Sequence, residues 1–289
     1  MNLSLRTFCR IIGLAMLVIG LSMFPSLIVA VIYKETVSFL AFLGTILFAA
    51  VCGFFLLWFG QPSTQHLKVR DGFLIVTVCW IVSALLGAAP FMLSGSIPDF
   101  FVGFFESCSG FPTTGATALS DVEILPKSIL FWRSFTHWIG GMGILIFAIA
   151  LMPSLGINGQ NIAVSEAPGP TLDKITPKMS DTAKALYTTY FVFTIVETIL
   201  LCLGGVSLYD SLLHTFGSVG TGGFSDYNNS VAHFDSVYAE MVITFFMILS
   251  GANFNLYYMS LKDGISSIFR DAEFRFYLFI IGASTILIA

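Results

Sequence analysis

FFESCSGFPTTGAT (residues 104–117) and LLHTFGSVGTGGFS (residues 212–225) are two versions of one pattern, and they decide the fold. Each consists of a short apolar run and then a loop of the form Thr-x-Gly-x-(Thr or Ser), with Gly223 lying 108 residues after Gly115. Apolar runs of about 10–14 residues are too short to cross a bilayer and are typical of re-entrant segments. The repeat therefore predicts two short helices, each followed by a glycine loop.

The composition places this pattern in a membrane. Charged residues make up 10% of the chain, apolar residues 56% and aromatic residues 15%, a balance that is not typical of a soluble globular protein. A bilayer core of about 30 Å requires roughly 20 apolar residues per helix. Seven apolar runs of about this length, each with at most one charged residue, predict membrane spans, at residues 8–33, 37–60, 73–93, 129–152, 185–206, 237–261 and 274–289.

The basic residues indicate the orientation of these spans, because Lys and Arg collect on the cytoplasmic side of bacterial membrane proteins. When the loops are sorted alternately, one side carries Lys34 and Lys127 alone. We expect Arg133, near the outer end of the fourth run, to extend its long side chain to the interface. The N-terminus is predicted to be cytoplasmic, together with the remaining basic residues: Arg6, Arg10, Lys68, Arg70, Lys174, Lys178, Lys184, Lys262, Arg270 and Arg275.

The opposite loops are acidic. An anionic vestibule would raise the local concentration of cations. Acidic outer loops also occur in proteins that transport nothing, but we prefer the interpretation that this protein handles cations. The acidic residues on this side are Asp99, Glu106, Asp121, Glu123, Asp210, Asp226, Asp235 and Glu240.

Other chain-wide signals are weak. The first apolar stretch is too long for a signal peptide and lacks a cleavage pattern, so we interpret it as a retained helix. The five cysteines contain no C-x-x-C pair and indicate neither a disulfide nor a metal site.

The glycine loops are the candidate site. Non-helical backbone at membrane depth persists only where it lines water or protein. Glycine lets successive carbonyl groups point at one place, and rings of carbonyl oxygens replace the water shell of K⁺. The predicted ion-binding residues are Thr113, Thr114, Gly115, Thr221, Gly222 and Gly223.

Glu106 and His214 occupy matched positions in the two short helices. An ionisable residue at membrane depth is a functional candidate, and we prefer a role in holding the loop in shape over direct ion contact. Glu197 lies within the fifth run and must either face the bundle interior or be protonated. Its role stays open.

Simpler interpretations compete with the functional ones. The glycine-rich segment 217–223 resembles a phosphate-binding loop, but the Lys that such a loop requires is missing. The glycines of 140–143 are expected to permit close helix packing rather than to form a hinge. Asn253 and Asn255 are expected to join neighbouring helices by hydrogen bonds.

The motifs together resemble the Trk/Ktr/HKT superfamily of potassium transporters, and specifically the membrane subunit of bacterial Trk potassium-uptake systems. The resemblance runs through the whole chain; each motif is weak alone, and their order and spacing make the match strong. It is carried by RDGFLIV (70–76), FFES (104–107), TTGAT (113–117), WIGGMG (138–143), PGP (168–170), TAK (182–184) and GFS (223–225).

The resemblance implies an all-α membrane protein of potassium-channel-like type. Two leading helices precede four units, each made of a span, a pore helix, a filter loop and a second span, around one K⁺ path. The chain would end early, in the third unit. The implied divisions are 1–70 for the leading pair, 71–152 for the first unit, 153–180 for a cytoplasmic loop, 181–261 for the second unit and 262–289 for the start of the third.

The resemblance also implies potassium uptake across the bacterial inner membrane. K⁺ is the transported ion, with no covalently bound cofactor. The implied partners are membrane lipid, a second copy of the chain and a cytosolic nucleotide-binding regulatory subunit, without nucleic acid. The sequence leaves open the choice of K⁺ over Na⁺, which depends on filter geometry, and the identity of any coupling ion.

Two other functions are open alternatives. The first is a secondary transporter with alternating access for another cation or a small solute. Loops that follow short helices and repeat in the same orientation favour a channel-like filter over that alternative. The second is an intramembrane enzyme, but Tyr209-Asp210 lacks the partner motif of an aspartyl protease, and no hydrolase motif is present.

Overall fold

The computed structural model describes residues 5–60, 69–143, 179–254, 256–257, 260, 264 and 266–288. Within these residues the regular secondary structure is helical, without a β-strand, which confirms the predicted all-α class. The elements are α1 (Leu5–Ser22), α2 (Phe24–Ile32), α3 (Thr36–Phe59), α4 (Val69–Leu93), α5 (Phe100–Gly110), α6 (Lys127–Gly141), α9 (Met179–Leu203), α10 (Leu208–Val219), η2 (Ser230–Phe234), α11 (Val237–Ser250), α13 (Ser266–Arg270) and α14 (Ala272–Ile288).

Four helical stretches among the described residues are long and apolar enough to cross a membrane. They agree with the first, second, third and fifth predicted runs. Apolar side chains are exposed along them, as expected of a surface in contact with lipid, with Phe54 64% and Trp58 82% exposed. The four stretches are Leu5–Ile32, Thr36–Phe59, Asp71–Leu93 and Leu186–Leu203.

The first predicted span is present, but two helices rather than one uninterrupted helix build it. α1 ends at Ser22 and α2 begins at Phe24, with Pro25 in its first turn. Proline has no backbone N–H and its ring crowds the preceding turn, so it interrupts a helix that would otherwise continue and is favoured where a new one starts.

Two further helices, α6 and α11, end inside their predicted runs. α6 ends at Gly141, and the N–H of Gly143 turns back to the carbonyl of Gly140 with a φ of 67°. α11 ends at Ser250, so the continuous span predicted over 237–261 is wrong. Both helices end at pairs of small residues, Gly140-Gly141 and Ser250-Gly251. Small residues, and glycine above all, allow backbone angles outside the helical range, so a helix ends there more readily. The continuation of the 129–152 run beyond 143 lies outside the described residues.

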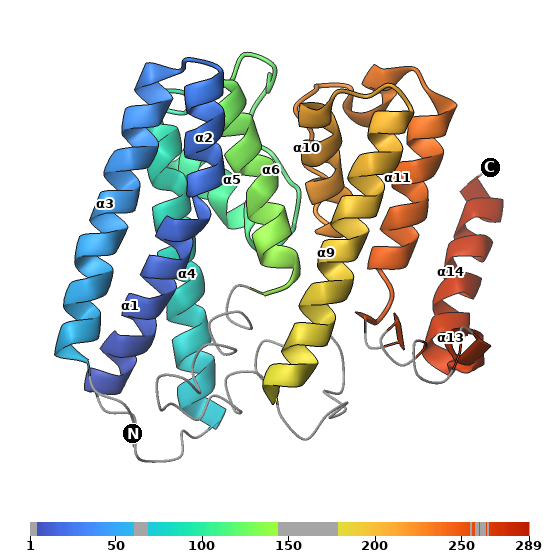
Figure 1. Ribbon diagram of the computed structural model, residues 1–289, viewed down its shortest axis with the longest axis horizontal. Helices are drawn as coiled ribbons and strands as arrows, with labels where there is room; N and C mark the ends of the chain where they lie inside the picture. The colour runs from blue at the N-terminus through green and yellow to red at the C-terminus, as the bar shows by residue number, and fades with distance from the viewer. Residues whose placement is uncertain are drawn as a thin grey trace.

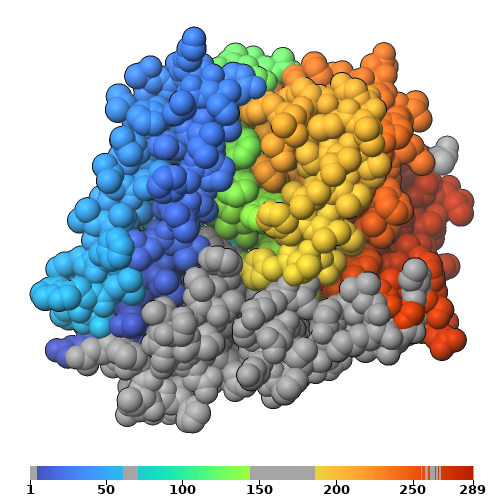
Figure 2. Space-filling view, in the orientation of Figure 1, coloured from blue at the N-terminus to red at the C-terminus, as the bar shows by residue number. Residues whose placement is uncertain are grey.

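The two copies of the repeat pack side by side (Figure 1). In the first, α5 packs against α4 and α6, while α1 packs against α3 and α4. In the second, α10 packs against α9 and α11. α10 also packs against α6, so α6 joins the copies; Figure 2 shows α6 (green) between the first helices (blue) and α9 (yellow).

Trp132 anchors α6 in the first copy. It is fully buried, and its indole N–H donates to the carbonyl of Gly87 on α4 over 2.9 Å. Its ring meets Phe42 and Phe111 edge to face, with centroids 6.3 Å and 6.1 Å away. These contacts fix α6 against α3, α4 and the end of α5, and so position the side chains that α6 directs at the glycine loops.

The basic residues that were assigned to opposite sides of the membrane lie at opposite ends of the molecule. Glu35, beside Lys34, accepts the backbone N–H groups of Lys127 and Ser128 over 2.7 Å and 3.1 Å at the start of α6. A carboxylate is favourable there because a helix N-terminus carries partial positive charge. Arg6 lies over the ring of Phe59, at the other end of α3. Lys34 and Lys127 therefore share one end, and which end faces the cytoplasm stays a prediction.

Candidate functional site

The two glycine loops have the same backbone conformation. Thr113 and Thr221 both have a φ of 57°, a left-handed value that is uncommon for residues other than glycine. Gly115 and Gly223 have φ values of 74° and 85°. The 108-residue repeat seen in the sequence is thus reproduced by four backbone angles, including two that threonine adopts at a cost.

The amide groups of the loops turn back onto the short helices in matched pairs. Thr114 and Gly115 donate to the carbonyl of Ser109 over 2.9 Å and 3.5 Å. In the second copy, the N–H groups of Gly222 and Gly223 donate to the carbonyl of Gly217 over 2.8 Å and 3.1 Å. These bonds satisfy the donors of each loop within its own copy.

The carbonyl oxygens of the loops are left without such partners. Between described residues, no hydrogen bond ends on the carbonyls of Thr113, Thr114, Gly115, Thr221, Gly222 or Gly223. α5 and α10 both end at the loops, and the C-terminus of a helix carries partial negative charge. Free carbonyl oxygens beside two helix C-termini make this region favourable for a cation.

The loops touch at their glycines. A Cβ atom on Gly115 would overlap the carbonyl oxygen of Gly222, and a Cβ on Gly222 would overlap the ring of His137. A Cβ on Gly223 would meet no atom within 4 Å. The structure therefore brings Gly115 and Gly222 together, and leaves the matching side of Gly223 open in the described part of the chain.

Glu106 and His214 both bind the residue that lies two positions after the loop glycine. Glu106 is buried, and its Oε1 accepts the hydroxyl of Thr117 over 2.8 Å and the N–H of Ala118 over 2.7 Å. His214 Nε2 lies 3.2 Å from the hydroxyl of Ser225, the repeat equivalent of Thr117. This geometry is that of a support for the loop, and the functional role of both residues stays a prediction.

Arg133 does not reach the membrane interface, contrary to the prediction. Its side chain is 2% exposed, and its Nε lies 2.8 Å from Oε2 of Glu106. Its Nη1 donates to the carbonyl of Ser225 over 3.0 Å, and its guanidinium carbon lies 3.5 Å from the centre of the Phe224 ring. The guanidinium is solvated inside the protein by a carboxylate, a carbonyl and an aromatic face, so it does not need the water at the membrane interface.

The acidic surface that the sequence predicts for the outer side is smaller than expected. Glu106 is paired with Arg133, and Asp226 is 2% exposed, with Lys127 Nζ 3.8 Å from its Oδ2 and His214 Nδ1 3.8 Å from its Oδ1. Burial raises the pKa of Asp226, and the neighbouring carboxylate of Asp210 raises this pKa further. Glu106 and Asp226 are therefore buried instead of exposed on an open vestibule.

Asn228 joins the segments that follow the two loops. Its Oδ1 accepts the N–H of Val122 over 3.0 Å, its Nδ2 donates to Asp121 over 2.8 Å, and its N–H donates to Glu123 over 2.9 Å. Asp121 and Glu123 thus serve as structural acceptors. These hydrogen bonds were not predicted from the sequence, because the partners are more than 100 residues apart and share no local pattern.

Glu197 faces the bundle interior, one of the two expected arrangements. It is buried in α9 and accepts the hydroxyl of Ser218 on α10, and its other carboxyl oxygen has no hydrogen-bond partner in the described part of the protein. The close packing expected at 140–143 is confirmed for Gly141, where a Cβ would lie 2.7 Å from Tyr190 Oη and 2.8 Å from Gly220 Cα. Asn255 lies outside the described residues.

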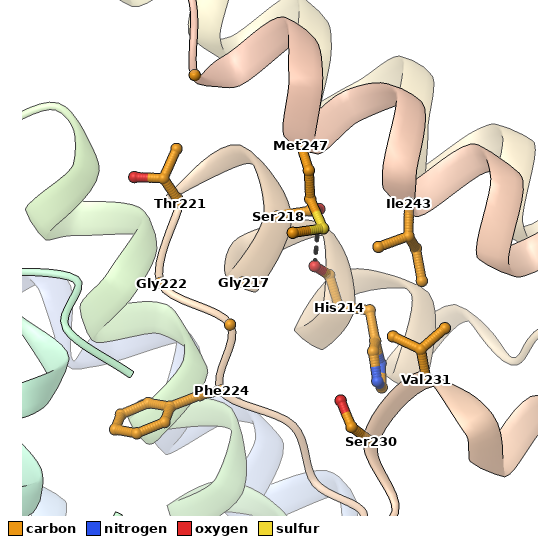
Figure 3. Close-up of a pocket in the computed structure, with 12 residues that line it drawn as sticks. His214, Gly217, Ser218, Thr221, Gly222, Phe224, Ser230, Val231, Ile243 and Met247 are labelled. Carbon is orange, nitrogen blue, oxygen red and sulfur yellow. Dashed lines mark hydrogen bonds between the residues drawn. The ribbon is translucent and has the colours of Figure 1, made fainter. Parts of the chain in front are cut away.

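A pocket of about 420 Å³ opens beside the second loop (Figure 3). Ile243 and Met247 of α11 face Ser218 and His214 of α10 across it, whereas Phe224 points away, over α6. Within the ranges that the structure describes, no group of three or more His, Cys, Asp or Glu side chains could hold a metal ion.

Comparison with known proteins identifies the family of the chain. The family model for TrkH, described as a cation transport protein, matches residues 37–289. The chain belongs to the TrkH family. With its long apolar helices, this TrkH-family chain is a multi-pass membrane protein.

Several TrkH relatives match most of the chain. The Trk system potassium uptake protein TrkH of Vibrio parahaemolyticus is 37% identical over 95% of this chain and 58% of its own length. The Trk system potassium uptake protein TrkG of Escherichia coli K12 is 36% identical over 97% of this chain and 58% of its own length. The chain thus spans less than two thirds of the curated relatives that it matches.

A solved TrkH structure shares the fold. The crystal structure of the potassium transporter TrkH from Vibrio parahaemolyticus superposes with a TM-score of 0.81 at 33% identity. The match covers 96% of this chain and 57% of that one. The all-helical architecture described above is therefore that of a TrkH protein over the shared part.

Proposed function

We propose that this chain belongs to a protein that takes up K⁺ through a filter of carbonyl oxygens, to which Thr113, Thr114, Thr221 and Gly222 contribute beside Gly115 and Gly223. One observation carries the proposal: two loops with the same left-handed angles direct their amides backward, and among the described residues their carbonyls accept no hydrogen bond at the ends of two short helices. The names of the TrkH relatives, potassium uptake proteins, agree with it.

The physical argument concerns dehydration. An ion loses its water without a prohibitive cost only where protein oxygens replace most of the water shell. Two loops contribute oxygens on one side of such an ion. We therefore propose that loops from the remaining length of a full TrkH protein complete the ring, with each span, short helix, loop and following helix forming one unit around a central path.

The setting of the protein is proposed on the family resemblance. We propose that the protein lies in the inner membrane of a bacterium with its N-terminus in the cytoplasm. We also propose that it forms a homodimer and binds a cytosolic nucleotide-binding regulatory subunit. The separation of Lys34 and Lys127 from Arg6, at opposite ends of α3, supports the charge sorting on which the orientation depends.

Growth on low K⁺ tests the function. We expect the full-length parent protein to restore growth of a bacterium that lacks its K⁺-uptake systems, and to raise initial uptake of radioactive Rb⁺ by at least about tenfold over cells with an empty vector. A full-length protein present in the membrane that restored neither growth nor uptake would contradict the proposal.

Cysteine labelling tests the orientation. In a background without the native cysteines, a membrane-impermeant reagent added to intact cells should leave Lys68→Cys unlabelled and should label Asn229→Cys, which is exposed beyond the second loop. Because charge sorting fixes all loops together, the reverse result would invert the orientation and remove the argument for an outer filter.

A further inference from the structure

Arg133 contacts both copies of the repeat at once. Its Nε bonds Glu106 of the first copy over 2.8 Å, and its Nη1 donates to the carbonyl of Ser225 in the second over 3.0 Å. The guanidinium also lies over the ring of Phe224. A planar guanidinium with five donors can serve two acceptors in fixed directions, which the single ammonium of lysine cannot reproduce.

These contacts reach equivalent points of the two loops. Glu106 also holds Thr117, two positions after Gly115. Ser225 lies two positions after Gly223, at the equivalent place in the repeat. A continuous chain of hydrogen bonds therefore runs from Thr117 through Glu106 and Arg133 to the backbone of Ser225, and it links the points at which the two loops end.

The described residues of the second copy show no such link. α11 begins at Val237 as α6 begins at Lys127, so the seventh residue of each helix is Ile243 in one and Arg133 in the other. Ile243 lines the open pocket beside the second loop instead of contacting a carboxylate (Figure 3). Among the described residues, the bridge is a feature of the junction between the first and second loops.

The pairing also controls charge near the loops. An unpaired positive charge close to the loops would repel a cation, most strongly where water is excluded. The Glu106 carboxylate balances the guanidinium while leaving Nη1 free to bond Ser225. Arg133 can therefore fix geometry without adding a net charge to the site.

We propose that Arg133 is a positioning residue that fixes the separation of the two loops and thereby sets the discrimination between K⁺ and Na⁺. This inference rests on the proposed function of the loops as an ion filter. Discrimination between two ions of equal charge depends on the spacing and number of the carbonyl oxygens around them, so a bridge between the loops acts on selectivity before it acts on total flux.

The test is Arg133→Lys in the full-length protein, reconstituted in liposomes. The charge remains, but the two simultaneous bonds to Glu106 and Ser225 are lost. We expect the ratio of K⁺ to Na⁺ uptake to fall about tenfold, equivalent to about 1.4 kcal/mol, while K⁺ uptake persists. Arg6→Lys is the matched control, since Arg6 also lies over an aromatic ring, at the other end of the molecule, and its ratio should not change.

Phe224→Leu provides a second variant should Arg133→Lys fail to accumulate, because it removes the ring under the guanidinium and keeps both of its hydrogen bonds. We expect the same direction with a smaller change in the ratio. Equal losses of K⁺ and Na⁺ uptake at an unchanged ratio would overturn the inference. If Gly115→Ser destroys selectivity while these variants do not, the inference about Arg133 fails and the filter stands; if none of them alters selectivity, the proposed filter itself fails.

Discussion

Gly115→Ser in the full-length protein is expected to lower the ratio of K⁺ to Na⁺ uptake by at least about tenfold and to weaken K⁺ affinity. Gly115 has a φ of 74°, where an L-residue is strained by roughly 1–3 kcal/mol. Its Cβ would also overlap the carbonyl oxygen of Gly222. That oxygen belongs to backbone, so the second loop itself must move, and the spacing of the carbonyls changes with it.

Initial rates of K⁺ and Na⁺ uptake at equal membrane abundance measure this effect. Gly44→Ala is the matched control, because Gly44 is exposed in α3 and a Cβ there would meet no atom within 4 Å. Alanine is a better helix former than glycine, so transport should be unchanged. A Gly115→Ser protein with the selectivity and K⁺ affinity of the parent would remove these loops from the ion path.

Glu106→Leu is expected to destabilise the protein by about 3–5 kcal/mol, because removal of one partner leaves the guanidinium of Arg133 buried without its carboxylate. The substitution also removes the acceptor of the Thr117 hydroxyl and the Ala118 N–H. Glu106→Gln, which keeps one oxygen acceptor, should cost less. The order of the unfolding midpoints in detergent should therefore be parent, Gln variant, Leu variant.

Glu240→Leu is the control for this series. Glu240 is exposed in the first turn of α11, so its loss removes a favourable charge at a helix N-terminus worth less than about 1 kcal/mol. An unchanged midpoint for Glu106→Leu would show that the Glu106–Arg133 pair adds nothing to the folded state.

The sequence predicted the features that depend on length and repetition. The all-α class follows from long apolar runs, and the matched positions of Thr113 with Thr221 and of Gly115 with Gly223 follow from the offset of the repeat. Two copies of one glycine loop should have the same backbone conformation, so left-handed angles are expected at equivalent positions. The position of Lys34 and Arg6 at opposite ends of the molecule was predicted from the distribution of basic residues among the loops.

Helix ends were predicted less well, because hydropathy reports only whether a segment suits lipid. α6 and α11 stop at Gly141 and Ser250 although apolar residues continue beyond them. The break between α1 and α2 falls at Pro25, a local feature that the length of an apolar run does not take into account. Backbone geometry at small residues and at proline decides such ends.

The contacts of Arg133 could not be predicted from spacing. A single arginine in an apolar run suggests a side chain that reaches for water, unless a buried carboxylate is near. That carboxylate, Glu106, is 27 residues earlier, and the Ser225 carbonyl is 92 residues later. Their approach depends on the packing of α10 against α6, which no local pattern records.

The central claim is that the carbonyls of the two loops bind the transported ion. A structure of the full-length protein with Rb⁺ or Tl⁺ in place of K⁺ tests it directly, since both ions are located by their anomalous scattering. We expect an ion between the loops, contacted by carbonyl oxygens of Thr113, Thr114, Thr221 and Gly222. An ion bound at a carboxylate such as Glu197 or Asp226, with none between the loops, would contradict it.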